Sequence, residues 1–161
     1  MSKVLVTGAS GYIALHIVDL LLKQGHKVRG TVRSLKDETK IEPIKKLNTH
    51  LSPSSLELVE AELLNGDSLE KAVQDMDYVI HVASPLPLTN PLDENEVIKP
   101  ALEGTLNIMR AAYNNKTVKR VVVTSSGLAI AGYKWEERTY TEQDWPNPDL
   151  MPMAYGKYIH F

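Results

Sequence analysis

A chain of 161 residues, 43% hydrophobic and 24% charged, is long enough for one soluble domain with a substantial core. A net charge of −2 gives no general attraction to nucleic acid or an anionic membrane, and the lack of cysteine excludes disulfides and thiolate metal sites. No apolar run approaches the roughly 20 residues of a membrane span, and Val4–Val6 is too short for the apolar region of a signal peptide. We expect a cytoplasmic protein with no metal, no nucleic-acid partner and no membrane partner.

The chain opens with a predicted strand, a glycine turn and a helix. Val4–Val6 is a short, mostly β-branched run typical of a buried strand, and Gly8 and Gly11 follow it. Between residues 13 and 22 the apolar side chains fall largely on one helical face, and Gly25 stands where a helix would end in a left-handed cap. This is the opening βα unit of a dinucleotide-binding fold.

The residue types in this unit suit a bound pyrophosphate. Gly8 allows a sharp turn, Gly11 lets the backbone approach the pyrophosphate, and Ala14 lets helix and strand pack closely. The free N–H groups and the dipole at the start of a helix favour a negative group. The spacing Gly-x-x-Gly-x-x-Ala also fits a turn without a ligand, but its place between an N-terminal strand and a helix favours a nucleotide.

The remaining pattern predicts further strands and helices in alternation. Strands are expected at 27–32, 56–60, 77–82 and 118–125, and helices at 36–47, from Asp67 as N-cap to Val73, and at 95–113. Pro43 should lie near the start or a bend of its helix, and Pro100 near the first turn or a kink of the last one. After Gly132 the chain turns polar, and three prolines predict an irregular tail over 133–161.

Five strands alternating with four helices predict an α/β fold of the Rossmann type. The sheet should be parallel and doubly wound, with the strand order 3-2-1-4-5. A ligand should lie outside the carboxyl ends of the strands, at the switch between the first and fourth strands.

The end of the second predicted strand bears on the choice of nucleotide. NAD sites usually place Asp or Glu there for the ribose hydroxyls, whereas this chain has Arg33, and Lys40 follows. The planar guanidinium suits a 2′-phosphate, which favours NADP over NAD. The alternative is an arginine that only projects into solvent.

Several stretches together resemble one family. They are Val6–Ile13, Val32–Arg33, His81–Pro85, Asn95–Gly104 and Arg120–Ser126. The chain resembles, over about residues 2–157, the N-terminal half of an extended short-chain dehydrogenase/reductase. Within this NAD-dependent epimerase/dehydratase superfamily it is similar to the dihydroflavonol reductase and cinnamoyl-CoA reductase-like group.

The resemblance implies an NADP site built from several loops. Its pyrophosphate contacts would be Gly8, Ser10, Gly11, Tyr12 and Ile13. Arg33 and Lys40 would meet the 2′-phosphate. Glu62 and Leu63 stand where the family usually has Asp-Leu beside the adenine. The nicotinamide ribose would be bordered by Val82, Ala83 and Ser84, although His81–Ala83 taken alone reads as strand core.

The resemblance also implies a Ser–Tyr–Lys catalytic set, of which Ser126 and Tyr155 would be members. In this chemistry the tyrosine moves the hydroxyl proton, the serine orients the carbonyl, and a lysine four residues after the tyrosine lowers its pKa. This chain departs from the pattern, because Ile159 occupies the lysine position and Lys157 is only two residues on. Without that lysine the pKa of Tyr155 should stay near the free value of about 10.

The chain stops where the catalytic helix should begin, so we expect a truncated or alternatively terminated product, a Rossmann domain over 1–161 that is incomplete at its C-terminus. The valines of the last strand should then be partly exposed.

Four functions compete. The first is an NADP-dependent oxidoreductase acting on a small-molecule carbonyl or secondary alcohol. The second is an inactive NADP-binding fragment, which could pair with other subunits through the helix Asn95–Tyr113. The others are a nucleotide-sugar epimerase or dehydratase and a purely structural module.

Overall fold

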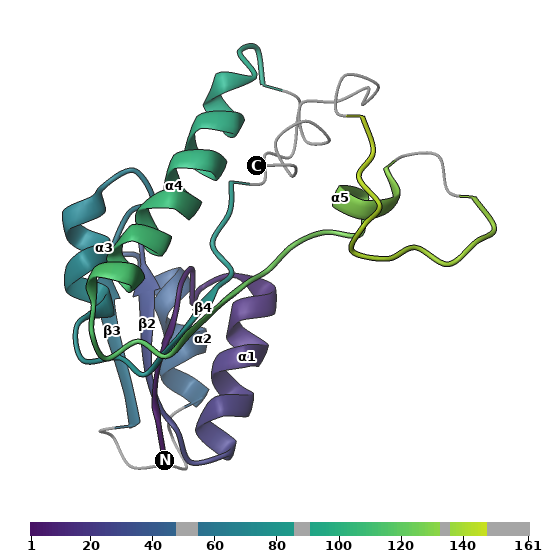
Figure 1. Cartoon of the computed structure of the whole chain (residues 1–161). Coiled ribbons are helices and arrows are strands. Elements are labelled where there is room, and N and C mark those ends of the chain that lie inside the picture. The colour runs from purple at the N-terminus through teal and green to yellow at the C-terminus, as the bar shows by residue number, and fades with distance from the viewer. Residues whose placement is uncertain (48–54, 86–90, 133–135, 148–161) are drawn as a thin grey trace.

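The computed structural model describes residues 1–47, 55–85, 91–132 and 136–147, and five parallel strands form its sheet (Figure 1). The strands are β1 (Lys3–Val6), β2 (Lys27–Val32), β3 (Leu56–Glu60), β4 (Tyr78–His81) and β5 (Arg120–Val123). Their order is β3-β2-β1-β4-β5, which confirms the predicted topology. The helices are α1 (Tyr12–Lys23), α2 (Glu38–Leu47), α3 (Gly66–Val73), α4 (Asn95–Asn114) and α5 (Leu128–Ala131).

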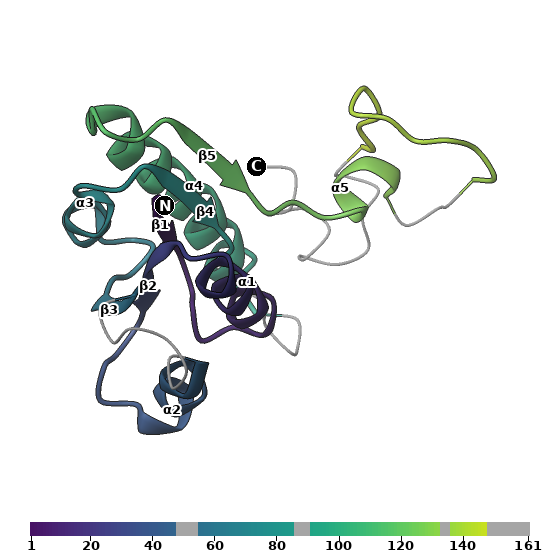
Figure 2. The same cartoon turned by 90° about the horizontal axis from the view of Figure 1, so that it is seen from below.

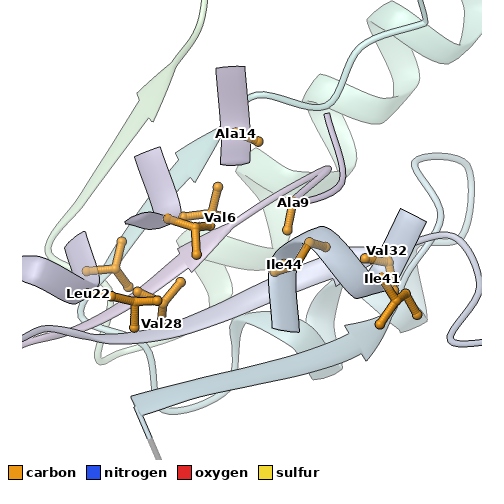
Figure 3. Close-up of a cluster of buried hydrophobic side chains, with 10 residues drawn as sticks. Val6, Ala9, Ala14, Leu22, Val28, Val32, Ile41 and Ile44 are labelled. Carbon is orange, nitrogen blue, oxygen red and sulfur yellow. The ribbon is translucent and has the colours of Figure 1, made fainter. Parts of the chain in front are cut away.

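The sheet has a helical layer on each face (Figure 2). Because side chains alternate along a strand, Val4 and Val6 of β1 pack with α1 and α2, while Leu5 packs with α3 and α4. The first cluster, part of which Figure 3 shows, comprises Val4, Val6, Ala9, Ala14, Val18, Leu22, Val28, Val32, Ile41 and Ile44. The second cluster centres on Leu5, Leu69, Val73, Val79 and Ile108. Continuous apolar runs in the strands therefore reflect burial on both faces.

The first helix ends as its sequence predicts. Gly25 has a φ of 81° and follows the C-cap Gln24. Its N–H bonds Leu22 O at 2.9 Å, and the N–H of His26 bonds Leu21 O at 3.0 Å. This pair of bonds satisfies carbonyls that the helix end would otherwise leave unpaired.

Several predicted boundaries are wrong. Asn65, not Asp67, is the N-cap of α3, because its side chain accepts the N–H of Ser68 at 3.1 Å. The strands expected at 77–82 and 118–125 cover only 78–81 and 120–123, and the helix expected at 36–47 begins at Glu38. Pro43 and Pro100 lie inside α2 and α4, beyond the first turn; the bend or kink expected at each stays a prediction. The short α5 was not predicted.

The edge of the sheet formed by β5 is only partly covered. β5 pairs with β4 alone, in a register that sets Val122 beside Ile80. Val122 is 52% exposed and Val123 is 42% exposed, in agreement with the expected partial exposure of this strand. Beyond β5 the chain leads to α5 and residues 136–147, which lie to one side of the sheet (Figures 1 and 2). Residues 136–147 contain no helix or strand.

Candidate coenzyme site

The glycine loop between β1 and α1 lies at the carboxyl edge of the sheet, where β1 separates β2 from β4. Gly8 has a φ of 67°, a conformation that favours glycine. A Cβ at Gly8 would stand 3.0 Å from the Cβ of Ala83, and one at Gly11 would stand 3.2 Å from the Gly8 carbonyl oxygen. The loop is therefore both tight and free of side chains at these two positions.

Among the described residues, the first backbone N–H groups of α1 have no hydrogen-bond acceptor. Gly11 is its N-cap and makes no side-chain cap hydrogen bond, and the first turn contains no acidic residue. The N–H of Leu15 makes the first helical bond, to Gly11 O at 2.9 Å, so the first turn keeps N–H groups without a helical acceptor. Together with the helix dipole, these donors suit an anion such as a diphosphate. Ser10, Tyr12 and Ile13 are exposed around this end of the helix.

Two buried threonines hold the loop in place. The N–H of Gly8 donates to Thr31 Oγ1 at 3.0 Å, and the N–H of Ala9 donates to the Thr31 carbonyl at 2.8 Å. Thr7 Oγ1 accepts the N–H groups of Val82 and Ala83, each at 3.0 Å. The loop is thus tied to β2 on one side and to the end of β4 on the other.

The same Thr7 hydroxyl meets a buried histidine. Thr7 Oγ1 lies 2.8 Å from His81 Nδ1. Because the hydroxyl oxygen already accepts two N–H bonds, we assign its proton to the bond with Nδ1, which makes His81 the neutral tautomer protonated at Nε2. His81 is only 3% exposed, and this burial lowers its pKa to about 4. The histidine is therefore neutral at pH 7.

The predicted 2′-phosphate residues follow β2. Arg33 directly follows the last residue of β2 and is exposed, and it joins none of the ion pairs between described residues. Lys40 lies on α2, with its Nζ 3.9 Å from Asp37 Oδ2. The pKa of Asp37 is lowered, first by the hydroxyl of Thr39 and also by Lys40. The Asp37 carboxylate would therefore compete with a bound phosphate for the Lys40 ammonium group.

The predicted adenine residues follow β3. Glu62 is exposed, and its N–H donates to Ser68 Oγ at 3.2 Å. Leu63 is half-buried against α4, where a Cβ at Gly104 would come within 2.8 Å of the Leu63 Cβ. Asn107 Nδ2 also donates to the Leu63 carbonyl at 2.9 Å. Leu63 therefore has a packing role that the sequence did not reveal.

Of the two predicted catalytic residues, Ser126 lies in the described part of the chain. Ser126 follows β5 and is half-buried; its Oγ accepts the N–H of Leu128 at 3.2 Å, at the start of α5. Tyr155 lies outside the described residues, as do Lys157 and Ile159. Ser84, expected near the nicotinamide ribose, is exposed after β4, while Val82 and Ala83 are half-buried.

Thus the structure gathers the predicted coenzyme residues Gly8, Gly11, Val82 and Ala83 into one contiguous set at the carboxyl edge, with Arg33 at the end of β2 and Glu62 after β3. The residues present fit a dinucleotide, because the loop carries no side chain at Gly8 or Gly11 and the first turn of α1 itself contains no acidic residue.

Sequence reasoning missed Thr7, Thr31 and the role of His81. The signal available was a polar residue at or next to the carboxyl end of three predicted strands: Thr7 after β1, Thr31 before the last residue of β2 and His81 at the end of β4. Burial at such positions demands a hydrogen-bond partner.

Comparison with known proteins identifies the class. The sequence profile of the NAD dependent epimerase/dehydratase family matches residues 4–157, and the chain belongs to this family. Its similarity to plant reductases assigns it to the dihydroflavonol reductase-like group of extended short-chain dehydrogenases/reductases, as the sequence motifs predicted.

Two relatives illustrate the similarity. Tetraketide alpha-pyrone reductase 1 of Arabidopsis thaliana is 42% identical over 130 residues, which cover 80% of this chain and 39% of the relative. Dihydroflavonol 4-reductase of Gerbera hybrida is 36% identical over 150 residues, which cover 93% of this chain and 40% of the relative. The chain thus spans about two fifths of the length of these curated relatives.

Solved structures share the fold. Gre2 of Candida albicans, in complex with NADPH, has a TM-score of 0.81 and 30% identity, with 99% of this chain and 49% of that chain covered. Vestitone reductase from alfalfa has a TM-score of 0.75 and 29% identity, with 99% and 50% covered. Among the helices that the structure describes, none is both long enough and apolar enough to span a bilayer.

Proposed function

We propose that the protein is an NADP-dependent oxidoreductase of the dihydroflavonol reductase-like type, acting on a small-molecule carbonyl or secondary alcohol. The observation that carries this proposal is the uncapped amino end of α1, bordered by Gly8 and Gly11 and tied by Thr7 to the end of β4. The NADPH bound in the related Gre2 structure supports the choice of coenzyme.

Each residue has a defined task in this proposal. Gly8, Ser10, Gly11, Tyr12 and Ile13 surround the diphosphate, to which the first turn of α1 donates hydrogen bonds. NADPH, when bound, supplies the hydride for the carbonyl carbon.

Further residues orient the coenzyme and the substrate. Arg33 and Lys40 hold the 2′-phosphate, Glu62 and Leu63 border the adenine, and Val82, Ala83 and Ser84 border the nicotinamide ribose. Ser126 orients the substrate carbonyl and Tyr155 provides the proton that completes the alcohol.

A second function is favoured by one sequence feature. Ile159 stands four residues after Tyr155, at the position where the family has lysine. Without a cation beside it, the tyrosine hydroxyl is a poor proton donor and acceptor at neutral pH. The chain would then bind NADPH without turnover.

One experiment separates the two functions. The chain is mixed with NADPH and a panel of aldehydes and ketones, absorbance at the nicotinamide band is followed, and binding is titrated directly. Turnover supports the oxidoreductase, whereas binding without turnover supports the second function. Absence of binding contradicts both.

The choice of NADP over NAD is tested at Arg33. Replacing Arg33 by alanine removes a cation suited to a bidentate phosphate contact, so NADPH should bind about tenfold more weakly or worse, while NADH affinity stays within about twofold. The matched control is Lys27→Ala, which removes the same charge at the amino end of the same strand. Equal losses for both coenzymes would remove the phosphate role of Arg33.

A further inference from the structure

Helix α4, which lies beside α3, holds the turn between β3 and α3 (Figure 1). Asn107 of α4 donates from Nδ2 to the Leu63 carbonyl at 2.9 Å, across 44 residues of chain. The Asn107 Oδ1 accepts from Arg110 Nη1 at 3.4 Å, so both ends of the amide have a partner. Gly104 faces the Leu63 side chain, and a Cβ there would stand 2.8 Å from the Leu63 Cβ. Because residues three apart share one face of a helix, α4 contacts both the backbone and the side chain of Leu63.

The turn fixes the direction of the Leu63 N–H group. The Glu62 carbonyl accepts the N–H of Asn65 at 3.0 Å, and the N–H of Ala61 donates to the Val32 carbonyl at 3.0 Å, which joins the turn to the end of β2. Because a trans peptide is planar, the Glu62 carbonyl and the Leu63 N–H point in opposite directions. The carbonyl points into the turn, so the N–H points out of it. Among the described residues, this N–H has no acceptor.

The turn therefore offers a donor and an acceptor on adjacent residues. The donor is the N–H of Leu63. The acceptor is the carboxylate of Glu62, which is exposed and joins none of the ion pairs in the described part of the chain. Adenine presents a ring-nitrogen acceptor beside an amino donor, which is the complementary pair. Since these two residues are the ones proposed to border the adenine, the direction of the Leu63 N–H governs how well an adenine fits there.

We propose that Asn107 is a positioning residue for the adenosine end of the coenzyme, an inference that rests on the function proposed above. Its hydrogen bond to the Leu63 carbonyl, with the close packing at Gly104, holds the Glu62–Leu63 peptide in the orientation in which the N–H meets the adenine. Asn107 acts through Leu63. Without this hydrogen bond only a fraction of the chains would have the turn in its binding orientation, and the affinity for the adenosine end would fall by that fraction.

The other end of α4 carries a matched contact. Asn115, the C-cap of α4, donates from Nδ2 to the carbonyl of Val73, the last residue of α3, at 3.1 Å. This bond has the same chemistry as that of Asn107 but lies at the C-terminal ends of the two helices, away from the turn. Asn115 also accepts two hydrogen bonds from Thr117, so Asn115→Leu should lose at least as much stability as Asn107→Leu. Only Asn107→Leu should change the adenosine site.

The test is direct titration of the full chain and both variants with three probes. These are NADPH, adenosine 2′,5′-bisphosphate as the adenosine end alone, and reduced nicotinamide mononucleotide as the other end alone. Asn107→Leu should weaken binding of the first two about fivefold or more, because one hydrogen bond that orders the turn is lost, and should leave the third within about twofold. Asn115→Leu should leave all three within about twofold, although urea denaturation shows it destabilised.

A coenzyme-free measurement tests the hydrogen bond itself. In NMR spectra of the chain without ligand, the backbone amide signals of Leu63 and Leu64 should shift in Asn107→Leu and stay in place in Asn115→Leu. Gly104→Ala reaches the same turn through a different contact, since its Cβ would displace the Leu63 side chain. This variant should show the same selective loss of affinity for adenosine 2′,5′-bisphosphate.

The outcomes separate the positioning role from the function on which it rests. A wild-type chain that binds neither NADPH nor adenosine 2′,5′-bisphosphate would overturn both. Wild-type binding that Asn107→Leu leaves unchanged would overturn the positioning role alone, as would an equal loss of affinity in Asn115→Leu or an equal loss for reduced nicotinamide mononucleotide. In these three cases the proposed function stands.

Discussion

Thr7 offers the sharpest test of how the glycine loop is held. Its hydroxyl serves three buried or half-buried groups at once: His81 Nδ1 at 2.8 Å and the N–H groups of Val82 and Ala83 at 3.0 Å each. Valine has nearly the same shape as threonine but has no hydroxyl, so Thr7→Val should leave the packing intact and orphan all three groups.

The loss of stability expected for Thr7→Val follows from the three groups that would lose their hydrogen-bond partner. An unsatisfied buried polar group costs about 1–3 kcal/mol, and the half-buried N–H groups of Val82 and Ala83 fall at the lower end because water can reach them. We therefore expect Thr7→Val to lower the free energy of unfolding by about 3–4 kcal/mol. Thr7→Ser keeps the hydroxyl and loses one methyl group, which should cost only about 1 kcal/mol.

The assay is urea denaturation followed by circular dichroism at pH 7, with the midpoint and slope fitted for wild type and both variants. Because Val82 and Ala83 would border the coenzyme, Thr7→Val should also weaken NADPH binding more than Thr7→Ser does. If the two variants lose the same stability, the hydroxyl does not hold the loop and the reasoning fails.

Three further predictions concern other residues of the site. The pKa of His81 is about 4 in the folded protein and near 6.5 in an unfolded chain, so between these pH values the unfolded state binds more protons. The contribution of His81 to the free energy of unfolding should therefore be constant above pH 6.5 and should fall by up to about 3 kcal/mol as the pH drops from 6.5 to 4. His81→Asn should remove that fall in urea titrations at several pH values, and identical pH profiles for the variant and wild type would refute it. Gly30→Ala would place a Cβ 2.7 Å from the Cβ of Ala9 and should cost about 1–3 kcal/mol of stability in the same denaturation assay, whereas a neutral result would show that the loop shifts freely. Asp37→Asn should remove the acidic neighbour of Lys40 and tighten NADPH binding by about twofold in a calorimetric titration, and weaker binding would contradict the proposed role of Lys40.

Much of the fold could be predicted because its signals are local or periodic. The strand order followed from the alternation of apolar runs and amphipathic helices, and the end of α1 followed from Gly25. The cap of α3 could not be chosen from the sequence, since Asn65 and Asp67 are both good N-cap residues and only backbone geometry selects one.

The parts of the site that were missed depend on distant segments. Thr7 meets its partners across 74 to 76 residues of chain, and no local pattern encodes such a pairing. Likewise the spacing of Leu102 and Met109 is visible in the sequence, but which apolar face of α4 is buried depends on the packing of Gly104 against Leu63. The glycine loop itself was predictable, because Gly8 takes a positive φ, a Cβ at Gly11 would crowd the Gly8 carbonyl, and both stand at fixed offsets from a strand.

The central claim is that the bare amino end of α1 binds the diphosphate of a nicotinamide coenzyme. Isothermal titration of the chain, shown to be folded by circular dichroism, with NADPH and with NADH tests it most directly. We predict one site per chain, tighter for NADPH, and loss of binding in Gly11→Val, whose side chain would crowd the Gly8 carbonyl. No heat with either coenzyme at millimolar concentration, or undiminished binding by Gly11→Val, would contradict the claim.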